Sequence, residues 1–115
     1  MPSGNVISLV RGRLRGIDAV IDASDLFRGA EKFITHIDAI LRGFCGRGYV
    51  AYIDDIDYEP VESDEGETLH YFYLPAVCRG EELVVVIELS ESPEHRYLAR
   101  VVDVRPLDTP SFTWY

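Results

Sequence analysis

Apolar residues recur at helical spacing over residues 26–44, and this is the clearest pattern in the chain. The positions that share one face of a helix are apolar: Leu26, Ala30, Phe33, Ile34, Ile37, Leu41 and Phe44. The opposite face is polar and includes Asp38 and Arg42, which are spaced for an i,i+4 ion pair. Ser24 or Asp25 can cap the first turn. The pattern therefore predicts one amphipathic helix.

Segments with strand character lie on both sides of this helix. Before it, β-branched residues predict a strand over Val6–Leu14 and a second over Ile17–Ile21, joined at Gly12 or Gly16 as a hairpin. After it, alternation and β-branched or aromatic content predict strands over residues 49–58, 69–77, 83–89 and 96–104.

The order ββαββββ predicts one α+β domain over residues 1–115, with an antiparallel, meander-like sheet of about five to six strands packed on one main helix. The run Leu83-Val84-Val85-Val86-Ile87 is apolar at every position, which predicts a central strand covered on both faces. Pro75 lies inside the predicted strand over residues 69–77, where it predicts that this strand is at an edge or contains a bulge. Because one helix cannot cover both faces of such a sheet, the sheet curls around the helix or its second face meets another subunit. A homodimer is thus one of two expectations.

The acidic charge is concentrated in one stretch. The chain has 20 acidic and 11 basic residues and a formal net charge of −9. Eight of the acidic residues, and no basic residue, lie within residues 54–67. Phosphate binding needs clustered lysine and arginine, so nucleic acid is not expected as a direct ligand. No apolar run approaches the ~20 residues that cross a bilayer, and the N-terminus lacks a secretory signal. The expected location is the cytoplasm, away from membranes.

The sequence gives little support for a metal site or a catalytic site. Cys45 and Cys78, the only cysteines, are far from any zinc-ligand spacing, and free thiols are expected in a reducing compartment. His70 and Cys78 would lie roughly 26 Å apart along one strand, too far to act as base and nucleophile. Pro60 stands where a calcium-binding EF-hand loop needs glycine. We therefore expect no enzyme and no cofactor, although Asp54 and its neighbours leave a looser divalent-cation site open.

Strand alternation makes Asp54 the awkward member of the acidic stretch. It would share a face with Tyr52 and Tyr58 and point towards the core, where a carboxylate must be paired. A bulge at Asp54-Asp55 would turn it outwards instead, and this is the favoured interpretation.

The acidic stretch is flanked by tyrosines, because residues 49–58 and 69–77 are the two arms of its hairpin. Tyrosine is enriched in protein interfaces, and clustered charge speeds association with an oppositely charged partner. The predicted partner-binding residues are Tyr52, Asp54, Asp55, Asp57, Tyr58, Glu59, Glu62, Asp64, Glu65, Glu67, Tyr71 and Tyr73.

The sequence thus favours a non-enzymatic binding or inhibitory module whose hairpin, residues 49–73, engages a protein with a basic surface. Such a module could imitate the phosphate charge of nucleic acid. Phage anti-defence proteins and toxin-neutralising immunity proteins share this acidic, single-domain character, which is an analogy of composition only. Two alternatives stay open. One is a small-molecule or divalent-metal enzyme domain with a pocket between helix and sheet, lined by Tyr52, Tyr71 and Asp54. The other is a structural subunit of a larger assembly.

Overall fold

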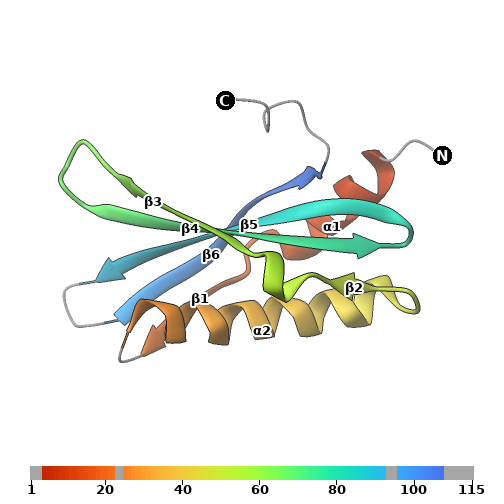
Figure 1. The fold of residues 1–115 in the computed structure, drawn as a ribbon, viewed down its shortest axis with the longest axis horizontal. Helices are drawn as coiled ribbons and strands as arrows, with labels where there is room; N and C mark the ends of the chain where they lie inside the picture. Colours follow the sequence, from red (N-terminus) through yellow and green to blue (C-terminus); the bar gives the residue numbers. More distant parts are fainter. Residues whose placement is uncertain (1–3, 23–24, 93–95, 108–115) are drawn as a thin grey trace.

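Helices cover one face of a single antiparallel sheet in the computed structural model, which describes residues 4–22, 25–92 and 96–107. The elements are α1 (Gly4–Leu14), β1 (Asp18–Asp22), α2 (Leu26–Cys45), β2 (Val50–Ala51), the 3₁₀ turn η1 (Ile53–Asp55), β3 (Asp57–Glu62), β4 (Thr68–Cys78), β5 (Glu81–Ser92) and β6 (Arg96–Pro106). The sheet order is β1-β6-β5-β4-β2, and β3 pairs with the other half of β4. The sheet is strongly twisted and curls over α2 (Figure 1). The predicted α+β class, with an antiparallel sheet on one main helix, is confirmed.

The amphipathic helix predicted over residues 26–44 is α2. Its N-cap is Asp25, whose carboxylate accepts a hydrogen bond from the Arg28 N–H (2.8 Å). Ser24, the other predicted cap, lies outside the described residues. The middle of the apolar stripe is buried against the sheet, and the predicted Asp38–Arg42 ion pair forms at 3.1 Å. A local pattern of this length carries enough information to place the helix.

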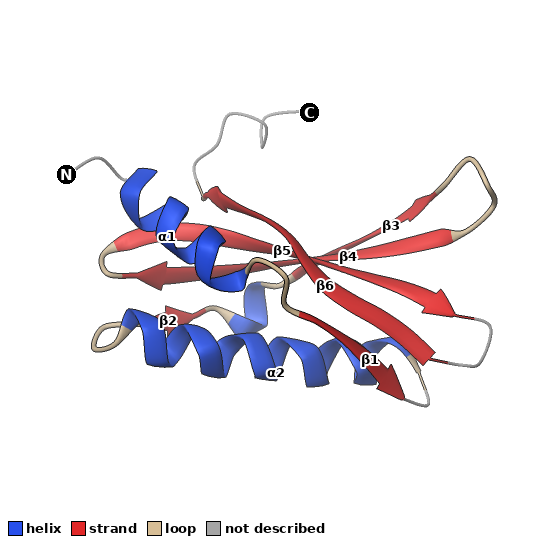
Figure 2. Ribbon diagram, turned by 180° about the vertical axis from the view of Figure 1, so that it is seen from behind, coloured by secondary structure: helices blue, strands red, loops and turns tan. Residues whose placement is uncertain are grey.

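The prediction of a strand over Val6–Leu14 is wrong, because this segment is the helix α1. Its buried residues Ile7, Val10 and Leu14 are spaced three and four apart, which places them on one helical face. They join the core cluster beside the half of β6 that β1 leaves unpaired (Figure 2). The burial of this face outweighs the strand preference of valine and isoleucine. The second predicted strand exists as β1, but it pairs with β6 rather than with the first segment.

The predicted strand over residues 49–58 is interrupted by η1. Opposite the interruption lies Pro75 of β4, whose carbonyl accepts a hydrogen bond from the Tyr52 N–H (2.9 Å). A paired residue in an antiparallel sheet directs its N–H and C=O to the same neighbour. The missing N–H of Pro75 therefore faces the gap between β2 and β3, where the ladder lacks one donor. Instead of the predicted edge or bulge in β4, Pro75 lies opposite the break between β2 and β3.

The central position predicted for the apolar run is confirmed by β5, whose residues Leu83–Leu89 are all buried. Val84 and Val86 point away from the helices, and each is buried within the one chain. They lie between paired residues of the adjacent strands, which include Tyr73 of β4 and Arg105 of β6. No second subunit is needed to bury these two valines. The homodimer itself stays a prediction.

Cys45 at the end of α2 and Cys78 at the end of β4 form a disulfide, so the prediction of free thiols is wrong. The two residues are 33 positions apart, and their pairing depends on how α2 packs under β4. Disulfides are typical of oxidising compartments, which weakens the reason for expecting a cytoplasmic location. Within the described residues, no helix is long and apolar enough to cross a membrane. The cytoplasmic location stays a prediction.

Candidate functional site

The β3–β4 hairpin extends beyond the N-terminal end of α2 (Figure 1). Residues 54–67, in and just before this hairpin, hold the densest cluster of acidic residues in the chain. We call residues 52–73 the acidic hairpin, and residues 62–67 its tip. The tip is closed by two backbone hydrogen bonds, from the Ser63 N–H to the Glu67 carbonyl (2.7 Å) and from the Gly66 N–H to the Ser63 carbonyl (3.0 Å). Gly66 has a φ of +83°, which glycine adopts without a steric cost. The tip is therefore an ordered turn.

The eight carboxylates of the acidic hairpin are exposed: Asp54, Asp55, Asp57, Glu59, Glu62, Asp64, Glu65 and Glu67. None of them forms an ion pair with a described basic residue. His70, the one histidine on the hairpin, has its pKa lowered by burial, with an opposing effect from the Glu91 carboxylate. It is thus neutral at pH 7 and adds no positive charge. The hairpin presents uncompensated negative charge to solvent.

The tyrosines of the hairpin lie on two opposite faces of the sheet and do not form one surface. Tyr58 faces α2, where its ring contacts Phe27 edge-on (centroids 5.2 Å apart) and its hydroxyl lies 2.8 Å from His70 Nδ1. Tyr71 and Tyr73 point to the other face. The predicted partner-binding residues therefore share one hairpin but divide between two faces. Whether they bind a partner stays a prediction.

A polar network around the buried Glu88, on the outer face of the sheet, was not predicted from the sequence. Glu88 of β5 is buried and accepts hydrogen bonds from the Tyr71 hydroxyl (2.9 Å) and from the Arg100 guanidinium (Nε, 2.9 Å). The sequence signal for this network was the position of Glu88 within an apolar run. A carboxylate buried there needs polar partners nearby. The Tyr71 hydroxyl therefore uses its hydrogen within the fold.

Tyr73 donates its hydroxyl hydrogen to Glu59 Oε1 across the hairpin (2.8 Å). Burial, followed by this hydrogen bond, raises its pKa to about 12 from the usual 10.0. The neutral phenol is therefore favoured in the folded state, and the stability it contributes is full below pH 10 and is lost as the pH rises towards 12. We expect NMR titration to show Tyr73 ionising well above the usual tyrosine pKa of 10.0. The Glu59→Gln variant, which removes the carboxylate charge, should lower this pKa, and an unchanged value would contradict the role of Glu59.

Asp54 is turned outwards, as the favoured interpretation expected, but η1 rather than a bulge turns it. Among the described residues, no group of three or more histidine, cysteine, aspartate or glutamate side chains is placed to hold a metal ion. Cys78 is bonded to Cys45 and has no thiol to act as a nucleophile.

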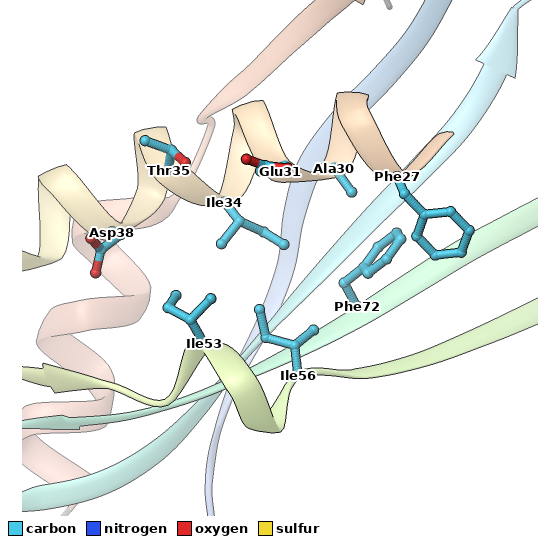
Figure 3. A pocket seen from close by; sticks show the side chains of 9 residues that line it. All are labelled: Phe27, Ala30, Glu31, Ile34, Thr35, Asp38, Ile53, Ile56 and Phe72. Atoms are coloured by element: carbon cyan, nitrogen blue, oxygen red, sulfur yellow. The ribbon is translucent and has the colours of Figure 1, made fainter. Parts of the chain in front are cut away.

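An apolar groove of about 420 Å³ lies between α2 and the start of the acidic hairpin. Its lining residues are Phe27, Ala30, Glu31, Ile34, Thr35 and Asp38 of α2, with Ile53, Ile56 and Phe72 opposite. Figure 3 shows Ile53 and Ile56 pointing towards α2, with Phe27 and Phe72 at one end of the groove. The groove lies between helix and sheet, where the sequence suggested a pocket, but its lining does not include Tyr52, Tyr71 or Asp54. Tyr71 points to the other face of the sheet.

The sequence placed Ala30, Ile34 and Asp38 on the helix but did not predict that they line a groove. Phe27 lies one position away from the apolar stripe of α2, and an aromatic residue beside such a stripe was a usable signal. Ile53 belongs to a segment that alternation assigned to a strand. Its exposure follows from η1, which the sequence pattern did not predict.

No family model, curated protein or solved structure matches the chain. The function is therefore argued from the chemistry of the acidic hairpin and the groove beside it.

Proposed function

We propose that this chain is a non-enzymatic binding protein that engages a basic surface of another protein through the acidic hairpin. The observation that carries the proposal is the set of eight exposed carboxylates on a projecting hairpin, none of which is paired with a described basic residue. Two carboxylates elsewhere in the fold, Asp38 and Glu88, are paired with arginines. The carboxylates of the acidic hairpin are turned to solvent, apart from the hydrogen bond that Glu59 accepts from Tyr73, and they can meet an external cation.

Charge and ordered geometry have separate roles in this proposal. The concentrated negative charge attracts a basic surface over a distance of about 10 Å at moderate ionic strength and so raises the association rate. The ordered tip keeps the carboxylates in place, which reduces the entropy lost on binding. Binding should therefore weaken steeply as salt is added.

One form of the proposal is an inhibitor whose carboxylates take the place of nucleic-acid phosphates on a nucleic-acid-binding protein. In that form, a DNA duplex competes with this chain for the partner. A partner that binds the chain and DNA simultaneously would exclude it.

The experiment compares two variants of equal net charge. The tip variant carries Glu62→Gln, Asp64→Asn, Glu65→Gln and Glu67→Gln. The control variant carries Asp18→Asn, Asp22→Asn, Glu81→Gln and Glu82→Gln, on other strands. Each removes four of the nine net negative charges. The probe is a peptide of lysine, arginine and serine, and its dissociation constant is measured by calorimetry.

The tip variant should bind the peptide about tenfold more weakly than the natural chain, because each exposed charge pair contributes about 0.2–1 kcal/mol. The control variant should lose much less affinity. Equal losses in the two variants would show that binding follows net charge rather than the hairpin, and would overturn the proposal. Thermal unfolding of both variants checks that the fold is retained.

A further inference from the structure

Large apolar side chains are exposed in the groove between α2 and η1. Contacts within the chain already hold them in place. Phe27 is 59% exposed and Ile53 is 48% exposed, although both line the groove. Phe27 is held by ring contacts with Tyr58 and Phe72, at centroid distances of 5.2 and 6.1 Å. Covering these side chains would remove apolar surface from water with little further loss of conformational freedom.

Acidic residues lie in the wall of this apolar surface and next to it in the chain. Glu31 lies in the groove wall, and Asp54 and Asp55 follow Ile53 in η1. All three are exposed, and none has an ion-pair partner in the described part of the chain. Asp38, in contrast, is already paired with Arg42 and accepts a hydrogen bond from the Tyr49 hydroxyl (2.7 Å). The groove therefore suits an occupant that is apolar at its centre and positively charged around it.

We infer that the groove takes an aliphatic or aromatic side chain from a lysine- and arginine-bearing segment of the protein that the acidic hairpin binds. The inference rests on the proposed function and names the chemistry of the partner. The carboxylates of Glu31, Asp54 and Asp55 meet the basic side chains, while Phe27 and Ile53 contact the apolar one. The groove and the hairpin are continuous through η1, so one segment of the partner can reach both.

The test uses two peptides with the same lysine and arginine content. The first carries leucines between the basic residues, and the second carries serines in their place. The natural chain should bind the leucine peptide about tenfold more tightly, a difference that burial of one large apolar side chain supplies. Equal affinity for the two peptides would overturn the inference.

Two groove variants and one matched control test whether the preference for the leucine peptide arises in the groove. Ile53→Ser removes apolar surface, and Thr35→Trp fills the groove without removing any. Both should abolish the preference for the leucine peptide, so that the two peptides bind with equal affinity. Leu9→Ser is the control, because Leu9 is 51% exposed on α1, away from the groove. It should keep the full preference. Thermal unfolding checks the fold of each variant.

The outcomes separate this inference from the proposed function. The tip variant should weaken binding of both peptides and keep the difference between them, whereas the groove variants should remove that difference. If groove variants keep the preference while the tip variant loses affinity, the groove inference is wrong and the proposed function stands. If the groove effect appears without a tip effect, the acidic hairpin is not the binding site. A groove that is instead filled by a second copy would show as a dimer in light scattering that Ile53→Ser dissociates, and this would also overturn the inference.

Discussion

Replacing Cys45 and Cys78 together with alanine should lower the free energy of unfolding by about 3.5 kcal/mol, as expected for a cross-link between residues 33 positions apart. The disulfide restricts the unfolded chain, which must otherwise lose that freedom on folding. A small domain has only about 5–15 kcal/mol of stability, so this loss is a large share. The melting temperature should fall by roughly 10–20 °C.

The measurement is urea unfolding with and without a dithiol reductant. The natural chain should lose stability in the reductant, because the disulfide becomes accessible when the chain unfolds. The double variant should give the same curve in both conditions. If the reductant has no effect on the natural chain, the two cysteines are not joined in the purified protein and the cross-link makes no contribution.

Phe33→Ala should be the most damaging single substitution in α2, with a cost of about 3–5 kcal/mol. Phe33 is 1% exposed and lies in the centre of the core between α2 and the sheet. Truncation removes a large buried ring and leaves a cavity that the surrounding strands cannot fully close. The variant should be close to unfolding at room temperature.

Phe27→Ala is the matched control, because it is the same substitution on the same helix. Phe27 is 59% exposed and meets the rings of Tyr58 and Phe72 edge-on, so its loss should cost about 1 kcal/mol. Chemical denaturation of both variants gives the two values. Similar costs for the two positions would mean that the helix is rotated relative to the sheet, with Phe27 buried instead.

Local patterns in the sequence were sufficient where each element is specified by its own residues. The apolar stripe placed α2, and the turn between β4 and β5 is the dipeptide Arg79-Gly80, in which both residues have positive φ. Such two-residue turns match the twist of paired strands. The negative charge of the candidate site was equally predictable, because acidic residues that are close together along the chain also lie close together in space.

Features that depend on distant contacts were not predictable in the same way. The residues of α1 carry both the helical spacing of Ile7, Val10 and Leu14 and the β-branched content of a strand. Contact with β6 decides between them. The groove exists because α2 packs opposite η1, and η1 lies opposite Pro75, which is more than twenty positions away along the chain. The Cys45–Cys78 pairing requires the same packing of α2.

The unpaired edge of β3 affects how readily the chain can aggregate. β3 pairs only with β4 among the described strands, so its other side offers backbone groups to any strand that approaches. Pro60 removes one N–H from this edge, and Asp57, Glu59 and Glu62 place carboxylates along it. Two copies that met edge to edge here would bring six carboxylates together in the antiparallel or the parallel sense. The charge proposed to attract a basic partner therefore also keeps this edge from adding identical strands.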